Sequence, residues 1–463
     1  MNIGVFTAIL VIFSFVLYKY LKKSNNSELV SEYQMTTNSS ALADFTKIST
    51  INASMKDFAS MNMAAVQFES VTKHLDHARD CLPIQAGRRS MAPMFYQYCP
   101  DEVLEDRGKG TVMTDEFVVT ADLARRFNFW RDVYAVYSVN HYVLHVGEYP
   151  EVVLEIADLS RFSDKTAAWK DHLAEKIEKT QKKEYRKLLL DLHSKRDLKI
   201  STLSPTLRRI ALSMKHIKDQ KKYALAAISL RVQRGQKEFI AEGIPAASSY
   251  MPYIESEFAK ANVPTEIAYL SFVESSFNLK AESKVGASGV FQLMRDTAQQ
   301  YIKVDGSIDE RNDPVKAARA AAKLLAFNYK LAGSWPLAIT AYNHGIGSVR
   351  RGIELTGSRD VGTLIKYYRS KQFGFASQNF YTSFLAILAT LKNWHTLFPD
   401  VKTYTPLKFQ VVRLDRPMAV NKIQKKYMIP TNEIKRFNPD ISRTFLHHGG
   451  RLPKGYEIKI PLI

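Results

Sequence analysis

The chain has very few cysteines, and this shortage excludes whole classes of protein. Its 463 residues include only two, Cys81 and Cys99, so a small disulfide-stapled scaffold is excluded. The pair is compatible with one disulfide in an oxidising compartment or with two free thiols. Histidines are scattered, and the adjacent His447 and His448 lack the spacing of ligands on one helix face, so we expect no metal site and no cofactor.

Acidic residues are also in deficit. Lysine and arginine number 65 against 46 aspartates and glutamates, which gives a formal net charge of +19. This charge predicts a polyanionic partner, and nucleic acid is the first candidate to weigh. Along residues 165–196, however, basic side chains are interspersed with acidic ones, as is typical of a solvated helix face. We therefore expect no nucleic acid partner, and the acidic groups of a cell envelope explain the charge instead.

Long apolar runs are missing except at the N-terminus. Residues 3–17 are almost wholly apolar, and residues 3–21 have about the length needed to cross a bilayer, roughly 20 residues. The sequence lacks an A-x-A cleavage site and a lipobox cysteine, which favours an uncleaved membrane anchor over residues 1–22. Lys19, Lys22 and Lys23 would by the positive-inside tendency place the rest of the chain in the cytoplasm. For an exported chain, either this tendency is overridden or further basic residues precede the sequence.

The rest of the sequence divides by composition into four regions. A hydrophobic content of 46% with 24% charged residues indicates a globular protein. Residues 23–75 are rich in Ser, Thr and Asn and predict a polar spacer. Residues 76–200 predict an accessory α/β region with a β-hairpin around Gly147 to Pro150, formed by the aromatic and β-branched residues of segments 133–146 and 151–160. Residues 201–400 have apolar positions at helical spacing, and residues 405–463 form a C-terminal module, so a mainly α fold is predicted.

In the helical region, one carboxylate, Glu274, follows directly after an apolar run. The run from Ile267 to Val273 is almost entirely apolar and predicts a helix buried on most sides, with Glu274 near its C-terminal end. Burial and the negative end of the helix dipole both disfavour a charged carboxyl group, so the pKa of Glu274 should be raised. An acid of this kind can protonate a glycosidic oxygen near neutral pH. On its own, a glutamate at a helix end is more often a solvated or capping residue.

Four separated segments lie around Glu274 in the sequence. The first is VESSFN, which contains Glu274, and the second is SKVGASGVFQLM, with Ser283, Gly286, Gly289 and Gln292. The third is ITAYNHGIGSV, with Tyr342 and Asn343, and the fourth is ASQNFY. Together they resemble the catalytic domain of lytic transglycosylases, the SLT type related to goose-type lysozyme, over about residues 243–392. The fourth segment departs from the family pattern, because Phe380 takes the tyrosine position and Tyr381 follows it.

This resemblance implies a lysozyme-like helical domain in which Glu274 is the catalytic acid and base. It also implies substrate-binding roles for Ser283, Gly286, Gly289, Gln292, Tyr342, Asn343 and Tyr381. Ordinary glycosidases use two carboxylates, but the nearby Asp309, Glu310 and Asp313 lie in a polar turn, and we give them structural roles. Asp313 before Pro314 has the pattern of an N-cap for a helix over residues 315–326.

The family does without a second carboxylate, because the N-acetyl carbonyl of N-acetylmuramic acid supports the cationic centre and the C6 hydroxyl of the same sugar attacks. The resemblance therefore implies non-hydrolytic cleavage of peptidoglycan, giving 1,6-anhydromuramic ends, by an enzyme anchored in a bacterial membrane with its catalytic domain in the periplasm. Two alternatives stay open. One is a hydrolase of the goose-lysozyme kind, and the other is a murein-binding scaffold without turnover, to which the altered ASQNFY segment gives some weight.

The C-terminal module resembles LysM modules. Its sequence predicts a βααβ unit, from a first strand at FQVVRL through IQKKYMIPTNEIKRFNP to a closing RLPKGYEIKIP. The G-D-T that usually follows the first strand is replaced by Leu414, Asp415 and Arg416, and a loop with Gly449 and Gly450 is enlarged. Glycan binding and simple packing against the catalytic domain are therefore both open for this module.

Overall fold

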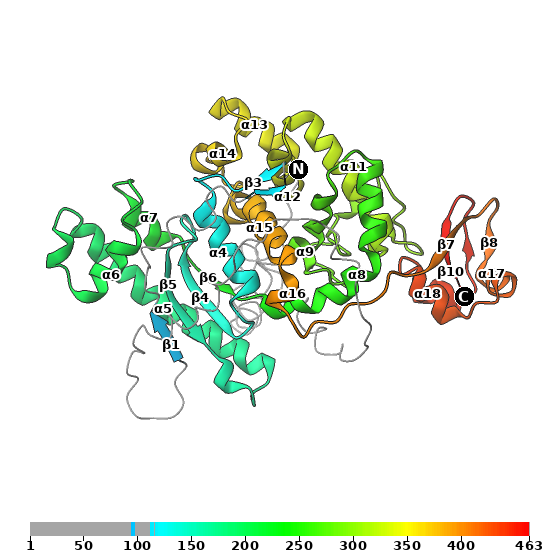
Figure 1. The fold of residues 1–463 in the computed structure, drawn as a ribbon, viewed down its shortest axis with the longest axis horizontal. Helices are drawn as coiled ribbons and strands as arrows, with labels where there is room; N and C mark the ends of the chain where they lie inside the picture. The colour runs from blue at the N-terminus through cyan, green and yellow to red at the C-terminus, as the bar shows by residue number, and fades with distance from the viewer. Residues whose placement is uncertain (1–93, 98–111, 115, 463) are drawn as a thin grey trace, which may run out of the picture. The chain divides into compact units, whose positions relative to one another are not determined.

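The computed structural model describes residues 94–97, 112–114 and 116–462, which are coloured in Figure 1. The predicted membrane anchor, the spacer, Cys81 and Cys99 lie outside these residues. The described residues form two compact units. We call residues 241–359 and 400–462 the Glu274 unit, and the described residues of 94–240 and 360–399 the sheet unit. The predicted mainly helical fold is confirmed.

The sheet unit is built on a four-stranded antiparallel sheet of order β1-β5-β4-β6. Its strands are β1 (Met94–Gln97), β4 (His141–Val146), β5 (Val153–Asp158) and β6 (Leu230–Arg234). The predicted hairpin around Gly147 to Pro150 is confirmed, since β4 and β5 pair across it with Tyr142 opposite Ala157. A separate pair is formed by β2 (Val112–Thr114) and β3 (Phe117–Val118).

Two predictions for this unit were wrong. Residues 133–135 continue the helix α4 (Ala124–Ala135) instead of joining the hairpin, because this stretch buries Val133 and Tyr134 on a helical face. Residues 230–234, predicted as helical, form β6, whose alternating Leu230 and Val232 pair with Val146 and Leu144 of β4. Pairing with a partner strand distant in the chain overrides local helical spacing here.

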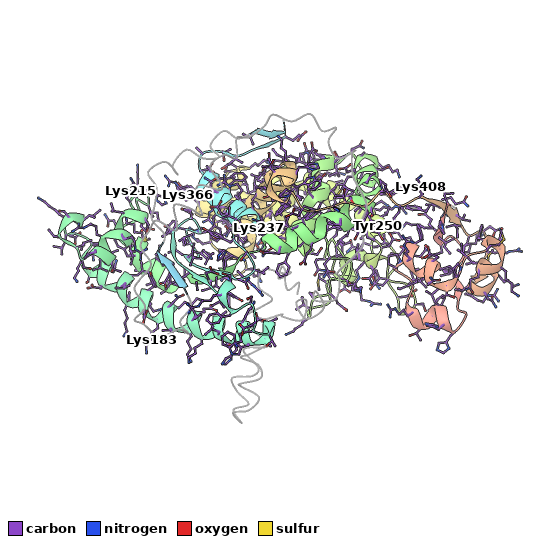
Figure 2. All side chains as sticks on the ribbon, turned by 60° about the horizontal axis from the view of Figure 1, so that its bottom comes forward. Lys183, Lys215, Lys237, Tyr250, Lys366 and Lys408 are labelled. Atoms are coloured by element: carbon purple, nitrogen blue, oxygen red, sulfur yellow. The ribbon has the colours of Figure 1, made fainter. Side chains whose placement is uncertain are left out.

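Helices complete the sheet unit. They are α5 (Ala167–Ser194), α6 (Pro205–Ser213), α7 (Lys222–Ile228), α14 (Val361–Tyr367), α15 (Phe375–Lys392) and α16 (Trp394–Leu397), with short 3-10 turns at Ser160–Phe162 and Ile200–Thr202. Leu144 and Leu154 of the sheet share a core with Leu189 of α5 and Ile210 of α6. Exposed lysines of this unit include Lys183 on α5, Lys215 in the turn after α6 and Lys366 on α14, which are labelled in Figure 2.

The Glu274 unit contains the catalytic-type motifs and the C-terminal module. Its helices are α8 (Lys237–Lys260, from residue 241 onward), α9 (Leu270–Ser275), α10 (Arg295–Ala298), α11 (Pro314–Ala332), α12 (Trp335–His344) and α13 (Ile346–Thr356), with 3-10 turns η7 (Thr265–Tyr269) and η8 (Glu310–Asn312). The predicted N-cap is confirmed, because the Asp313 carboxylate accepts hydrogen bonds from the backbone N–H groups of Val315 (3.0 Å) and Lys316 (3.2 Å). The helix α11 then runs beyond its predicted end to Ala332.

The C-terminal module has the predicted βααβ order. Its outer strands β7 (Phe409–Arg413) and β10 (Glu457–Pro461) pair antiparallel, and between them lie α17 (Val420–Tyr427) and α18 (Thr431–Phe437). The enlarged loop contains a short helix, α19 (Arg443–His447), and strand β9 (Arg451–Leu452), which pairs with β8 (Met418–Ala419).

In the part of the chain that the structure describes, no helix is long and apolar enough to cross a membrane. The predicted span at residues 3–21 lies outside that part.

Candidate active site

The short helix α9 carries Glu274 into the interior. All of its residues are buried, and Glu274 itself is only 1% exposed. The helix ends in two consecutive left-handed residues, Ser276 (φ 50°) and Phe277 (φ 59°), whose N–H groups donate back to the carbonyls of Phe272 (2.8 Å) and Ser271 (3.2 Å). Non-glycine residues in this region of φ/ψ space are costly and cluster at functional sites. Glu274 therefore lies at a sharply turned helix end.

A glycine on α8 allows this turn to be buried. A Cβ atom at Gly243 would lie 2.1 Å from the carbonyl oxygen of Ser276, so only glycine permits α8 to approach so closely. The apolar run of the sequence and this close approach together account for the burial of Glu274.

Burial has the expected electrostatic consequence. It raises the pKa of the Glu274 carboxyl to about 8, in agreement with the expectation from sequence. Within the described residues, no group forms a hydrogen bond with its Oε2 atom. Glu274 is thus protonated at neutral pH and has an oxygen atom to which none of the described residues bonds, which is what a general acid requires. Its catalytic role stays a prediction.

Two hydroxyl groups next to Glu274 are tied to one loop. The Ser275 hydroxyl donates to the carbonyl of Val290 (3.0 Å) as well as to that of Ser271 (3.0 Å). The Tyr342 hydroxyl on α12 donates to the carbonyl of Phe291 (2.8 Å). Burial, and after it the charge of Glu274, raise the pKa of Tyr342 well above its usual value, so the two side chains interact electrostatically. Residues 281–293, which we call the glycine loop, therefore accept hydrogen bonds from two side chains that neighbour the candidate acid.

The glycine loop holds four of the predicted substrate-binding residues, and the structure shows what each does in the free protein. Ser283 pairs with Ala287 through its backbone N–H and accepts the Ala287 N–H on its hydroxyl oxygen, both at 2.8 Å. Gly286 (φ 89°) and Gly289 (φ 75°) adopt left-handed conformations, and a Cβ at Gly289 would lie 1.8 Å from the Arg311 carbonyl oxygen. Both glycines are thus required by the backbone path.

The Gln292 side chain forms hydrogen bonds within the glycine loop, and its contact with substrate stays a prediction. Its backbone is also left-handed (φ 44°), and its side-chain amide donates to the carbonyls of Gly289 (2.8 Å) and Ala281 (3.2 Å). Both N–H groups of this amide therefore stabilise the glycine loop, and only the amide oxygen is available to bind a ligand.

The other predicted binding residues lie on helices. Asn343 is buried on α12, beside Tyr342. Tyr381 is on α15 of the sheet unit, where it is buried with its ring 6.3 Å from that of Phe384. A contact of Tyr381 with substrate stays a prediction.

Sequence reasoning missed Arg311, which lies in the polar turn assigned to structural roles. Its guanidinium Nη1 donates to the carbonyls of Gly286 (2.6 Å), in the middle of the glycine loop, and of Leu293 (3.0 Å), at its end. Asp309 holds the same guanidinium through Nε (2.9 Å) and Nη2 (2.7 Å). The only trace of this arrangement in the sequence is the spacing of Asp309 and Arg311 in one tight turn.

The neighbouring carboxylates have the structural roles that we gave them. Asp309 pairs with Arg311 (2.7 Å), Glu310 pairs with Lys316 (3.0 Å), and Asp313 caps α11. In the described part of the chain, no group of three His, Cys, Asp or Glu residues is arranged to hold a metal ion.

Comparison with known proteins places these motifs in a family context. Residues 251–365 match the family model of the transglycosylase SLT domain, a range that includes Glu274, the glycine loop and Tyr342. The chain is 27% identical over 178 residues to membrane-bound lytic murein transglycosylase D of Escherichia coli, in strain K12 and in strain CFT073. These matches cover 38% of this chain and 39% of each relative, so the chain spans about two fifths of the curated relatives' length.

Solved structures give more distant matches. The 70 kDa soluble lytic transglycosylase of Escherichia coli is 20% identical, with 49% of this chain and 36% of that chain covered and a TM-score of 0.28. An inactive variant of the lytic transglycosylase Slt from Pseudomonas aeruginosa is 19% identical, with coverages of 44% and 33% and a TM-score of 0.28.

Proposed function

We propose that this chain is a peptidoglycan lytic transglycosylase in which Glu274 is both the acid and the base. One observation carries the proposal: within the range that matches the SLT domain, a fully buried glutamate with its pKa raised to about 8 has an oxygen atom to which no described residue bonds. A buried polar atom without a partner is costly, and in native proteins it calls for an explanation. Proton transfer to a substrate is that explanation here.

The reaction begins with protonated Glu274. Its proton passes to the oxygen of the β-1,4 bond between N-acetylmuramic acid and N-acetylglucosamine, and the C1–O bond breaks with release of a neutral sugar hydroxyl. The N-acetyl carbonyl of the muramic acid supports the positive charge that develops at C1. This substrate group replaces the second carboxylate of ordinary glycosidases.

The second step restores the acid. Glu274, now a carboxylate in a site that disfavours its charge, takes the proton of the muramic C6 hydroxyl. The C6 oxygen bonds to C1, which closes the 1,6-anhydro ring. No water is consumed, and Glu274 ends the cycle protonated.

The glycine loop and α12 are proposed to hold the sugar against Glu274. Ser283, the amide oxygen of Gln292, Tyr342 and Asn343 supply polar groups for the N-acetyl sugar, and Gly286 and Gly289 let the backbone approach it. Tyr381 is proposed as a further contact.

The location is also a proposal. The curated relatives are described as membrane-bound, and residues 1–22 of this chain have the composition of a membrane anchor. We propose that the chain is anchored in the membrane of a bacterial envelope with its catalytic domain in the periplasm. The C-terminal module is proposed as a degenerate LysM-like unit.

The test is mass analysis of the products from purified murein, with the full chain in detergent. The proposal expects products lighter by one water than hydrolysis products, and none with Glu274→Gln. Glu255→Gln is the matched control, because burial also raises the pKa of Glu255, to about 6, but Tyr269 donates a hydrogen bond to it (3.4 Å). This control should keep activity.

Two other results would identify the alternatives. Products with ordinary reducing ends would indicate a hydrolase that uses water in place of the C6 hydroxyl. A folded chain that binds murein and releases nothing would indicate a scaffold.

A further inference from the structure

The C-terminal module is joined to the rest of the Glu274 unit by backbone pairing. Ile441 of the module forms an antiparallel bridge with Ile308, the N–H of Asp309 donates to the carbonyl of Asp440 (2.8 Å), and the N–H of Ser442 donates to that of Ser307 (2.9 Å). Ile308 is 1% exposed and belongs to the hydrophobic core of the module. Residues 307–309 therefore act as an additional edge of the module.

Buried charges reinforce this junction. Lys316 pairs with Asp440 (2.8 Å), Lys459 pairs with Asp313, and the Tyr456 hydroxyl donates to Asp440 (2.8 Å). The side chains of both carboxylates are 0% exposed. A charge that stays buried without its partner is strongly destabilising, so these pairs oppose any shift of the module on α11. The module is thus held in one place on α11 and on the turn before it.

The turn that the module holds is the one that braces the glycine loop. Asp309, whose N–H is fixed by Asp440, binds the Arg311 guanidinium, and Arg311 binds the carbonyls of Gly286 and Leu293. In the same turn, the Asn312 side chain accepts a hydrogen bond from the Ser288 hydroxyl (2.8 Å). A continuous series of contacts therefore leads from the module to the loop.

The loop in turn borders Glu274. Its Val290 carbonyl accepts a hydrogen bond from Ser275, which follows Glu274 in the chain, and its Phe291 carbonyl accepts one from Tyr342, which interacts electrostatically with Glu274. Three loop residues, Gly286, Gly289 and Gln292, have left-handed backbones. Such a path persists only when the surrounding structure over-determines it.

We propose that the C-terminal module is a positioning element of the active site, and that Asp440 and Arg311 are positioning residues that hold the glycine loop against Glu274. Neither residue touches the substrate. The link between module and loop stands on the contacts alone, and only its effect on turnover rests on the proposed function.

Hydrogen exchange of the full chain tests the link without any activity. In Arg311→Gln the brace itself is lost, and in Asp440→Ala the segment that presents the Asp440 backbone carbonyl to Asp309 loses its buried side-chain partners Lys316 and Tyr456. In both variants, amides of the glycine loop such as those of Gly289 and Gln292 should exchange about tenfold faster than in the parent, because the loop opens locally. Arg319→Gln is the matched control. Arg319 pairs with Glu257 (2.8 Å) and with Glu457 of the module (2.9 Å), and its partners among the described residues do not include the glycine loop. Its loop amides should keep the parent rate.

Unchanged loop exchange in a folded Asp440→Ala variant overturns the proposal, as does equal acceleration in Arg319→Gln. If Asp440→Ala fails to fold, Asp440→Asn replaces it, with the same expectation and the same result that overturns it.

Turnover of soluble glycan strands from murein tests the consequence. Arg311→Gln and Asp440→Ala should lower kcat by about tenfold or more with little change in KM, because a misplaced loop affects the transition state more than binding. The double variant should be no slower than Arg311→Gln alone, since both changes break one series of contacts. Faster loop exchange with parent kcat overturns the positioning role.

The two failures are distinguishable. A parent chain that cleaves nothing disproves the proposed function, and the exchange experiment then still decides whether the module braces the loop. A parent chain that cleaves murein, with a folded Asp440→Ala variant as fast as the parent, disproves the positioning role alone.

Discussion

Two buried carboxyl groups of the Glu274 unit have the same exposure and opposite chemistry. Glu274 is 1% exposed and Asp313 is 0% exposed. Burial raises the pKa of Glu274 to about 8. Burial also acts on Asp313, but the charges of Lys459 and Lys316 outweigh it and lower the pKa of that carboxyl below its usual value. The described surroundings of Glu274 supply no cation, and those of Asp313 supply two.

The difference shows that partners, rather than depth, decide what a buried carboxyl group does. A carboxylate with its charge satisfied joins two segments of chain and has no proton to give. A carboxyl group that stays protonated in an apolar place keeps a proton for transfer. Residues 307–316 contact the module at both of their ends and contact the glycine loop through Arg311 and Asn312 between them, so one small region contains both solutions.

The most severe way to break the comparison is to remove the unpartnered acid. Glu274→Gln should lower the rate of murein cleavage by about 10³-fold, the size of a general acid and base contribution. The protein should stay as stable as the parent or become more stable near neutral pH, because no charge satisfied by the protein is lost. Product analysis and urea unfolding measure the two effects. A variant with parent activity would show that the acid is elsewhere.

The opposite change removes Lys459, one of the two cations that pair with the buried Asp313 carboxylate. Lys459→Met should destabilise the chain by about 3–5 kcal/mol, because Asp313 keeps its charge in a buried site with half of its compensation gone. Urea unfolding measures this loss. In the double variant Lys459→Met with Asp313→Asn, the amide oxygen can still cap α11, and most of the stability should return. A single variant as stable as the parent would contradict a structural role for the pair.

Glu274 and Asp313 should make the stability of the folded chain depend on pH in opposite directions. Glu274 has a folded pKa of about 8, above its unfolded value of about 4.3, so the folded state holds its proton and stability falls as pH rises from about 4 to 8. Asp313 has a lowered folded pKa, so its contribution is complete above about pH 4 and is lost as pH falls through the folded value.

Unfolding free energies of the parent and of Glu274→Gln measure the first effect, and their difference should grow between pH 4 and 8. The cleavage rate should also fall about tenfold per pH unit above about pH 8, as the acid loses its proton. A rate that is flat up to pH 10 would be incompatible with Glu274 as the acid.

The smallest effect is expected for a partly exposed ion pair between α11 and the C-terminal module, which can be compared with the buried pair of Lys459 and Asp313. Arg319 is 34% exposed and pairs with Glu257 and Glu457. Since water screens a partly exposed pair, Arg319→Gln should cost about 1 kcal/mol or less, and the cost should shrink in high salt. A loss as large as that of Lys459→Met would show that exposure does not govern the strength of these pairs.

The sequence was sufficient where the cause is local. The apolar run before Glu274 predicted its burial and its raised pKa, the pair Asp313 and Pro314 predicted the start of α11, and residues on both sides of Gly147 predicted the β-hairpin. Each of these features depends on side chains within a few positions of one another, where helical and strand periodicities can be followed directly.

The sequence was insufficient where the partner is distant or is a backbone atom. β6 forms because Leu230 and Val232 pair with β4, far away in the chain. Arg311 binds carbonyl oxygens of Gly286 and Leu293, and every residue has a carbonyl, so the sequence marks no acceptor. Lys459 and Asp313 are 146 positions apart and had no visible relation before folding. The membrane anchor and the cysteine pair lie outside the described residues.

The place of Ile308 in the core of the module has a consequence for how this protein can be cut and recombined. A cut near residue 400 follows the change in composition, yet it removes a buried side chain that the module needs. An isolated segment 400–463 would have a gap in its core, and Lys459 and Asp440 would lack their partners Asp313 and Lys316. Its transfer to another enzyme would require a host turn able to replace residues 307–309. The segment that can be exchanged between proteins therefore includes residues 307–309 in addition to the C-terminal segment that the change in composition outlines.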